Sequence, residues 1–172
     1  MEQCIIGMLV ANQPGVLTRI SGLISRRGFN IDSLTVSETN DPGISRITVT
    51  TQGDQKIIEQ IVLQTQKLIE VRAVRVENVE ADILRELLLV KLATTETQRS
   101  RILEICQIYQ ADIVDLTKSS LIIELTGKPG KIDAFLDVLS PYPIIELCRT
   151  GLTAISRGPD VLEYDRTESH RA

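Results

Sequence analysis

The sequence is poor in aromatic residues and nearly lacks histidine. It contains no tryptophan, and aromatic residues make up only 3% of its 172 residues. Its hydrophobic cores must therefore be built from isoleucine, leucine and valine. The one histidine, His170, lies in a polar stretch close to the last residue. A serine or cysteine nucleophile activated by histidine is therefore nearly excluded.

Cysteine is scarce as well. Cys4, Cys106 and Cys148 are odd in number, lie far apart and form no Cys-x-x-Cys pair. This pattern excludes a disulfide scaffold and a zinc site, so we expect no metal site in this chain. Each cysteine lies within an apolar run, which predicts three small core residues.

Charge and hydropathy exclude two further classes of protein. The net charge is −4 and basic runs are no longer than pairs such as Arg26-Arg27, whereas nucleic-acid binders usually present a basic face. No apolar run approaches the ~20 residues that span a bilayer, and Glu2 follows Met1 without the basic start of a signal peptide. We expect a soluble, cytoplasmic protein that binds neither nucleic acid nor membrane.

Common catalytic motifs are missing too. No Gly-x-Gly-x-x-Gly follows the first expected strand, and no Walker sequence or Gly-x-Ser-x-Gly elbow occurs. The carboxylates of Glu38, Asp41, Glu59 and Glu70 fall at turns or on polar helix faces, where solvated charge explains them. We therefore expect no catalytic residue.

The first half of the chain has the periodicity of four strands and two helices. The strands are expected at 4–11, 29–39, 44–51 and 71–76, and the helices at 16–28 and 54–68. A change of phase near Asp32-Ser33 suggests a bulge in the second strand. The order β-α-β-β-α-β is that of the ferredoxin-like fold.

The second half repeats this order. Its strands are expected at 86–93, 112–117, 121–126 and 144–149, the last extended by 152–155, and its helices at 95–109 and 131–139. The sequence therefore predicts an α+β protein with two tandem ferredoxin-like domains. We expect the two domains to span residues 1–78 and 83–158, followed by a disordered tail at 159–172. Because domains of this size are marginal alone and expose strand edges, we also expect a homodimer.

The segment Asn12-Gln13-Pro14-Gly15-Val16-Leu17 joins the first strand to the first helix. Helix-initial N–H groups without internal partners can hold a carboxylate, and Gly15 leaves this backbone accessible. The amide of Asn12, helped by Asn30, can contact both charged groups of an α-amino acid. A plain helix cap and turn explain the same residues. The corresponding loop of the second half, 94–97, lacks Pro-Gly, so a site of this kind is expected only in the first half.

These residues resemble a known family. The segments 12–17 and 26–36, with the run Gly-Phe-Asn-Ile-Asp-Ser-Leu-Thr-Val, resemble the ACT domain of the regulatory subunit of acetohydroxyacid synthase, also called acetolactate synthase. The resemblance covers nearly the whole chain except the tail, through 45–48, 85–91, 127–135 and 149–158.

The resemblance implies a regulatory subunit without catalytic activity or a cofactor of its own. Such a subunit binds and activates a catalytic large subunit, which uses thiamine diphosphate, magnesium and FAD to condense pyruvate with a second 2-oxoacid. It also confers feedback inhibition by a branched-chain amino acid, usually valine. The implied effector contacts are Asn12, Gly15, Val16 and Leu17 of one chain, with Asn30 and Ile31 of its neighbour. The sequence does not choose between valine, isoleucine and leucine.

Three other functions compete with this one. A free-standing ACT-type sensor that regulates transcription or another enzyme shares the same motifs. An RNA-recognition domain shares the β-α-β-β-α-β order but needs aromatic residues on its sheet, and the few aromatic residues here are scattered. An independent enzyme ranks last, because no catalytic motif is present.

Overall fold

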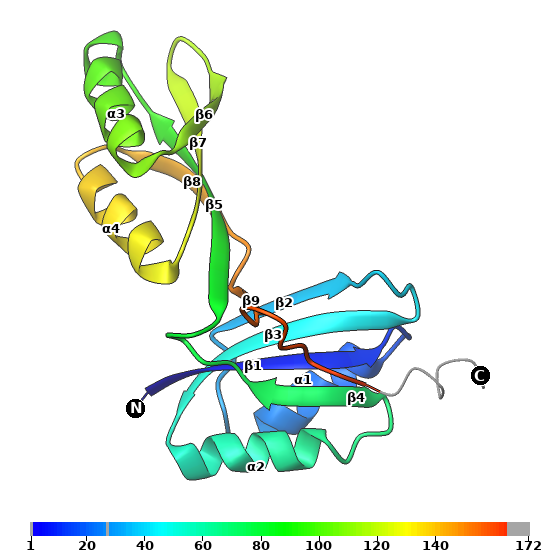
Figure 1. Ribbon diagram of the computed structural model, residues 1–172. Helices are drawn as coiled ribbons and strands as arrows, with labels where there is room; N and C mark the ends of the chain where they lie inside the picture. The colour runs from blue at the N-terminus through cyan, green and yellow to red at the C-terminus, as the bar shows by residue number, and fades with distance from the viewer. Residues whose placement is uncertain (1, 27, 165–172) are drawn as a thin grey trace. The chain divides into compact units, whose positions relative to one another are not determined.

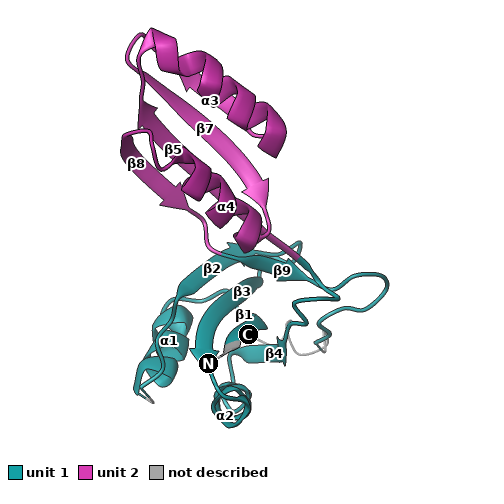
Figure 2. Cartoon of the chain, turned by 90° about the vertical axis from the view of Figure 1, so that its left-hand side faces the viewer, with its two compact units in different colours: residues 1–83, 152–172 teal, residues 84–151 magenta. Residues whose placement is uncertain are grey.

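The computed structural model describes residues 2–26 and 28–164 (Figure 1). Contacts between residues divide the chain into two compact units, one formed by residues 1–83 with 152–172 and the other by residues 84–151 (Figure 2). Each unit contains one antiparallel sheet and two helices. The prediction of an α+β protein with the β-α-β-β-α-β order twice is thus confirmed.

The first unit is built around a sheet of four strands in the order β2-β3-β1-β4. Its elements are β1 (Glu2–Ala11), α1 (Val16–Arg26), β2 (Ser33–Glu38), β3 (Ile44–Gly53), α2 (Gln55–Thr65) and β4 (Val71–Val76). Alternate residues of a strand point to opposite faces. Ile6 and Met8 of β1 therefore share one face, where they pack in one core with Ile20 of α1 and Ile61 of α2. We call the face opposite these helices the outer face.

The second unit has a sheet in the order β6-β7-β5-β8. Its elements are β5 (Ile83–Ala93), α3 (Glu96–Tyr109), β6 (Asp112–Leu116), β7 (Ser120–Gly127), α4 (Pro129–Leu139) and β8 (Ile144–Arg149). Thr95 and Gln98 form a capping box that starts α3. At the end of β8, Arg149 binds both carboxylate oxygens of Glu86, at 2.6 and 2.7 Å, and this hydrogen bonding raises the pKa of Arg149.

The second strand is shorter than predicted. β2 begins at Ser33 and not at Phe29, and it pairs with β3 in unbroken register, so the expected bulge near Asp32-Ser33 is absent from it. Phe29 and Ile31 nevertheless pack against the first core. Their apolar spacing in a loop imitates a strand, which explains the error.

The C-terminal part of the chain also differs from the prediction. Residues 153–155 form a separate short strand, β9 (Thr153–Ile155), because Gly151 turns the chain with a φ of +81° after β8. Residues 152–158, expected in the second domain, group with the first unit. Residues 159–164 of the expected tail have defined contacts, while 165–172 lie outside the described residues.

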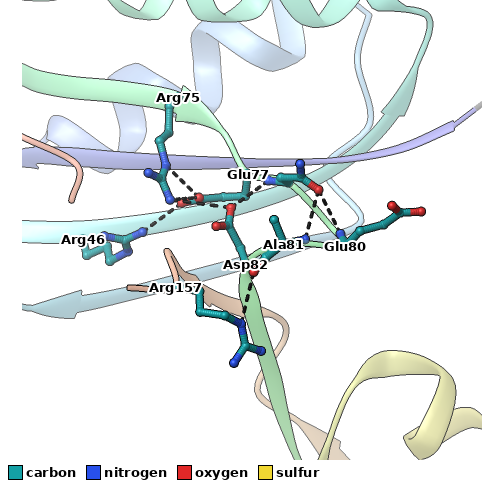
Figure 3. A network of polar contacts seen from close by, with 8 residues as sticks. Arg46, Arg75, Glu77, Glu80, Ala81, Asp82 and Arg157 are labelled. Carbon is teal, nitrogen blue, oxygen red and sulfur yellow. Dashed lines mark hydrogen bonds and ion pairs between the residues drawn. The ribbon is translucent and has the colours of Figure 1, made fainter. Parts of the chain in front are cut away.

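A buried carboxylate lies on the outer face of the first sheet. Glu77, with a fully buried side chain, accepts hydrogen bonds from Arg46 Nη2 at 2.8 Å and from Arg75 Nε at 2.8 Å (Figure 3). A Cβ added to Gly7 of β1 would lie 2.1 Å from Glu77 Oε1. Glycine at this position therefore lets the carboxylate approach the sheet, and the ion pairs attach the connector at residues 77–82 to it.

We expect Gly7→Ala to lower the free energy of unfolding. The new methyl displaces a buried carboxylate from its arginine partners, and weakening a buried charged hydrogen bond costs about 1–3 kcal/mol. Urea unfolding followed by circular dichroism measures the change. Gly22→Ala is the matched control, because a Cβ there meets nothing within 4 Å. In a helix this change should stabilise by up to about 1 kcal/mol. Equal midpoints for Gly7→Ala and the unmodified chain would contradict the role given to Gly7.

Candidate effector-binding site

The loop between β1 and α1 leaves backbone donors open at the start of the helix. Arg19 N donates to Gly15 O at 3.0 Å, and among the described residues no acceptor contacts the N–H groups of Leu17 and Thr18. Such N–H groups carry partial positive charge and suit an anion. Gly15 has a φ of +86°, and a Cβ there would meet nothing within 4 Å. The backbone of this loop is thus open on the side of Gly15.

The side chain of Asn12 is held in one orientation. Its Nδ2 donates to Glu38 Oε1 and to the carbonyl of Pro42, both at 3.0 Å, and its backbone N–H donates to Gly43 O at 2.8 Å. Both amide hydrogens are therefore engaged within the chain, whereas the sequence led us to expect that they contact a ligand carboxylate. Oδ1 of Asn12 accepts no hydrogen bond from the described residues. This oxygen and the carboxylate of Glu38 together suit an ammonium group.

The two apolar residues predicted in this loop have different environments. Val16 is buried and belongs to the first core. Leu17 is 40% exposed and presents its side chain to solvent. Of the two, Leu17 is the one that offers apolar surface to a ligand, while Val16 fixes the start of α1.

Asn30 and Ile31 lie at the other end of the sheet. Thr51 Oγ1 donates to Asn30 O at 2.6 Å, and Ile31 packs against the first core. The loop at Asn12 lies at the opposite end of β3, because Ala11 pairs with Ile44. From Ile44 to Thr51 the strand advances about 24 Å, at about 3.4 Å per residue. One chain therefore does not bring the two parts of the predicted site together.

Sequence reasoning missed the residues that hold Asn12. Residues 40–43, between the strands expected at 29–39 and 44–51, form a turn, and the contacts of this turn with the β1–α1 loop depend on the pairing of β1 with β3. Glu38 was interpreted as a solvated charge and is instead the partner of Asn12. Only the strand register makes these contacts predictable.

Two of the three cysteine thiols are poorly suited to nucleophilic chemistry. Burial raises the pKa of the Cys4 thiol to about 11 and also raises the pKa of Cys106. Cys148 was predicted to be a core residue, but it is exposed on β8. It pairs with Leu89, in the opposite phase to the core residues Leu88 and Val90 of β5.

In the part of the chain that the structure describes, no three His, Cys, Asp or Glu residues are grouped as a metal site would require, and no helix is long and apolar enough to cross a membrane.

Comparison with known families and proteins assigns both halves of the chain. Residues 6–73 match the model of the acetohydroxyacid synthase small subunit-like ACT domain, and residues 85–158 match that of the small subunit of acetolactate synthase. A probable acetolactate synthase small subunit from Methanothermobacter thermautotrophicus is 48% identical over 155 residues, which are 90% of this chain and 92% of the relative. This chain belongs to the acetolactate synthase small-subunit family.

Two further members of the acetolactate synthase small-subunit family match over nearly their full length. The isozyme 3 small subunit of Escherichia coli is 39% identical over 92% of this chain and 98% of its own. The crystal structure of the small subunit from Thermotoga maritima superposes with a TM-score of 0.86 at 36% identity. This match covers 93% of this chain and all of the other. The resemblance inferred from the sequence is thus confirmed, and so is the fold.

We expect one of the three thiols to react rapidly with Ellman's reagent at pH 8 in the folded protein. Cys148 is exposed, whereas Cys4 and Cys106 are buried, and the Cys4 thiol stays protonated well below pH 11. Denaturation should raise the count to three. Cys148→Ser should remove the fast reaction and Cys4→Ser should not. A fast reaction of all three thiols would contradict the burial described above.

Proposed function

We propose that this chain is the non-catalytic regulatory subunit of acetolactate synthase in branched-chain amino acid biosynthesis. It binds and activates the catalytic large subunit and makes it sensitive to feedback inhibition by valine or another branched-chain amino acid. Thiamine diphosphate, magnesium and FAD belong to the catalytic subunit. The observation that supports this most directly is the β1–α1 loop of the ACT domain, which offers donors for a carboxylate beside acceptors for an ammonium group.

The proposed binding mode assigns each group of the amino acid to one part of the loop. The carboxylate binds the N–H groups of Leu17 and Thr18 at the positive end of α1. The ammonium group binds Oδ1 of Asn12 and the carboxylate of Glu38. The aliphatic side chain contacts Leu17, where burial of a methylene contributes about 0.8 kcal/mol.

A second copy of the chain completes the site in this proposal. β2 is an edge strand of the first sheet, and β2 of another copy can pair along this edge. An antiparallel pair about a two-fold axis places the Ser33 end of one β2 beside the Glu38 end of the other. Asn30 and Ile31 of the second copy then lie at the same end as Asn12, whose separation from them within one chain is about 24 Å along β3.

Sharing the site between copies explains how an effector regulates. A ligand shifts an equilibrium only by its different affinities for two states. A site made of two chains is complete in one arrangement of the dimer and incomplete in another. The effector therefore favours the arrangement that completes it.

The matching catalytic subunit tests the proposed function. Its pyruvate condensation is measured with and without this chain, across valine, leucine, isoleucine and unrelated amino acids. We expect the chain to raise the rate, and one branched-chain amino acid to lower it only when the chain is present. Unchanged rates under every condition would contradict the proposal and favour a free-standing amino-acid sensor.

Substitutions in the loop test the binding site. We expect Asn12→Ala and Gly15→Asp to weaken valine binding by about 10- to 150-fold, because hydrogen bonds to a charged group contribute about 1.5–3 kcal/mol. Gly15→Asp also adds negative charge beside the carboxylate and strains a φ of +86°. Isothermal titration calorimetry measures both affinities. Gln13→Ala is the control, since this side chain is exposed and the hydrogen bonds described for Glu38 and Pro42 come from Asn12. Unchanged affinity in both variants would overturn the site.

A further inference from the structure

Residues 152–164 form a segment that we call the C-terminal strap. Leu152 is 3% exposed and Ala154 is fully buried, although they follow the second half of the chain in sequence. Beyond β9 the strap runs along the outer face of the first sheet towards β4, as the orange-to-red trace shows (Figure 1). The strap is therefore part of the first unit.

The first half of the strap contacts the connector at residues 77–82. Arg157 Nε donates to the carbonyl of Ala81 at 3.4 Å (Figure 3). The conformation of this connector is well defined by its own side chains, because Ala81 N donates to Asn78 Oδ1 at 3.1 Å and Asn78 N donates to Asp82 Oδ2 at 2.7 Å. The connector is also the segment that carries the buried Glu77 onto the sheet.

The last residue of the strap contacts the turn that holds the effector loop. Tyr164 OH donates to Asp41 Oδ2 at 2.9 Å. The second carboxylate oxygen of Asp41 accepts from Gly43 N at 2.9 Å. The carbonyls of Pro42 and Gly43 in turn accept the hydrogen bonds of Asn12. A short series of hydrogen bonds thus leads from the strap to the proposed ammonium-binding residue.

The middle of the strap is loosely packed. A cavity of about 470 Å³ is lined by Leu9 and Arg46 of the sheet and by Ile155, Val161 and Leu162 of the strap. Val161 is 62% exposed. Segments with few buried apolar contacts open at low free energy. The start of the strap is anchored by the buried Leu152 and Ala154, whereas residues 156–164 are held chiefly by the contacts of Arg157 and Tyr164. The loss of either contact should release much of this part.

We propose that the C-terminal strap couples the connector to the effector loop, with Tyr164 as a positioning residue for Asn12. This inference rests on the proposed function only in naming a branched-chain amino acid as the ligand. The docked strap keeps the β2–β3 turn, residues 39–43, in the conformation that orients Asn12. Coupling between two equilibria is reciprocal, so binding of the effector also favours docking of the strap.

Hydrogen exchange of the full chain, measured by mass spectrometry, tests the strap without any effector. We expect Tyr164→Phe to speed exchange in peptides covering 12–17 and 39–44 by about threefold to tenfold, as for loss of one hydrogen bond. Arg157→Gln should speed exchange in the same peptides from the first half of the strap. Tyr142→Phe in the second unit is the matched control and should leave them unchanged.

The same variants are then titrated with valine, leucine and isoleucine by calorimetry. Tyr164→Phe should weaken binding by about threefold to tenfold, and the effector should slow exchange in residues 157–164 of the unmodified chain but not of this variant. If no amino acid binds the unmodified chain, the proposed function fails while the exchange result still decides the coupling. Unchanged exchange and unchanged affinity in Tyr164→Phe would overturn the coupling itself.

Discussion

Strand β1 of the first unit is buried on both faces of its sheet. Ile6 and Met8 pack against the helices, while Ile5 and Leu9 are 1% and 6% exposed on the outer face. A sheet with apolar residues on both faces needs two covering layers. The helices form one layer, and the connector with the C-terminal strap lies on the other. Glu77 lies in this second layer, over Gly7 and between Arg46 and Arg75.

The candidate site depends on the same arrangement. Asn12 follows β1 directly, and the pairing of Ala11 with Ile44 brings it to the turn before β3. The side-chain amide of Asn12 is oriented by that turn. The turn also accepts a hydrogen bond from Tyr164 of the strap, through Asp41. The loop proposed to bind the effector is therefore supported by elements from both ends of the first unit's sequence.

Much of this structure was predictable from local patterns. The tandem α+β architecture follows from periodicity, and the loop from 12 to 17 stands out by its composition. The start of β2 was misplaced because Phe29 and Ile31 pack in the core from a loop. The strap was predicted only as a strand extension at 152–155 followed by a tail, because residues 156–164 have no periodicity and their contacts arise between segments far apart in the chain. Such contacts depend on the tertiary arrangement, which local sequence patterns do not reveal.

The separation of Asn12 from Asn30 along β3 has a consequence for concentration. If the site is shared between two copies as proposed, a single chain carries two incomplete half-sites. Each half-site contributes only part of the binding free energy. A ligand that binds only the associated form shifts association by mass action. The apparent affinity for the amino acid would then fall on dilution of the protein, and the amino acid would oppose dissociation of the pair. Abundance of the subunit would thereby set its sensitivity to the metabolite.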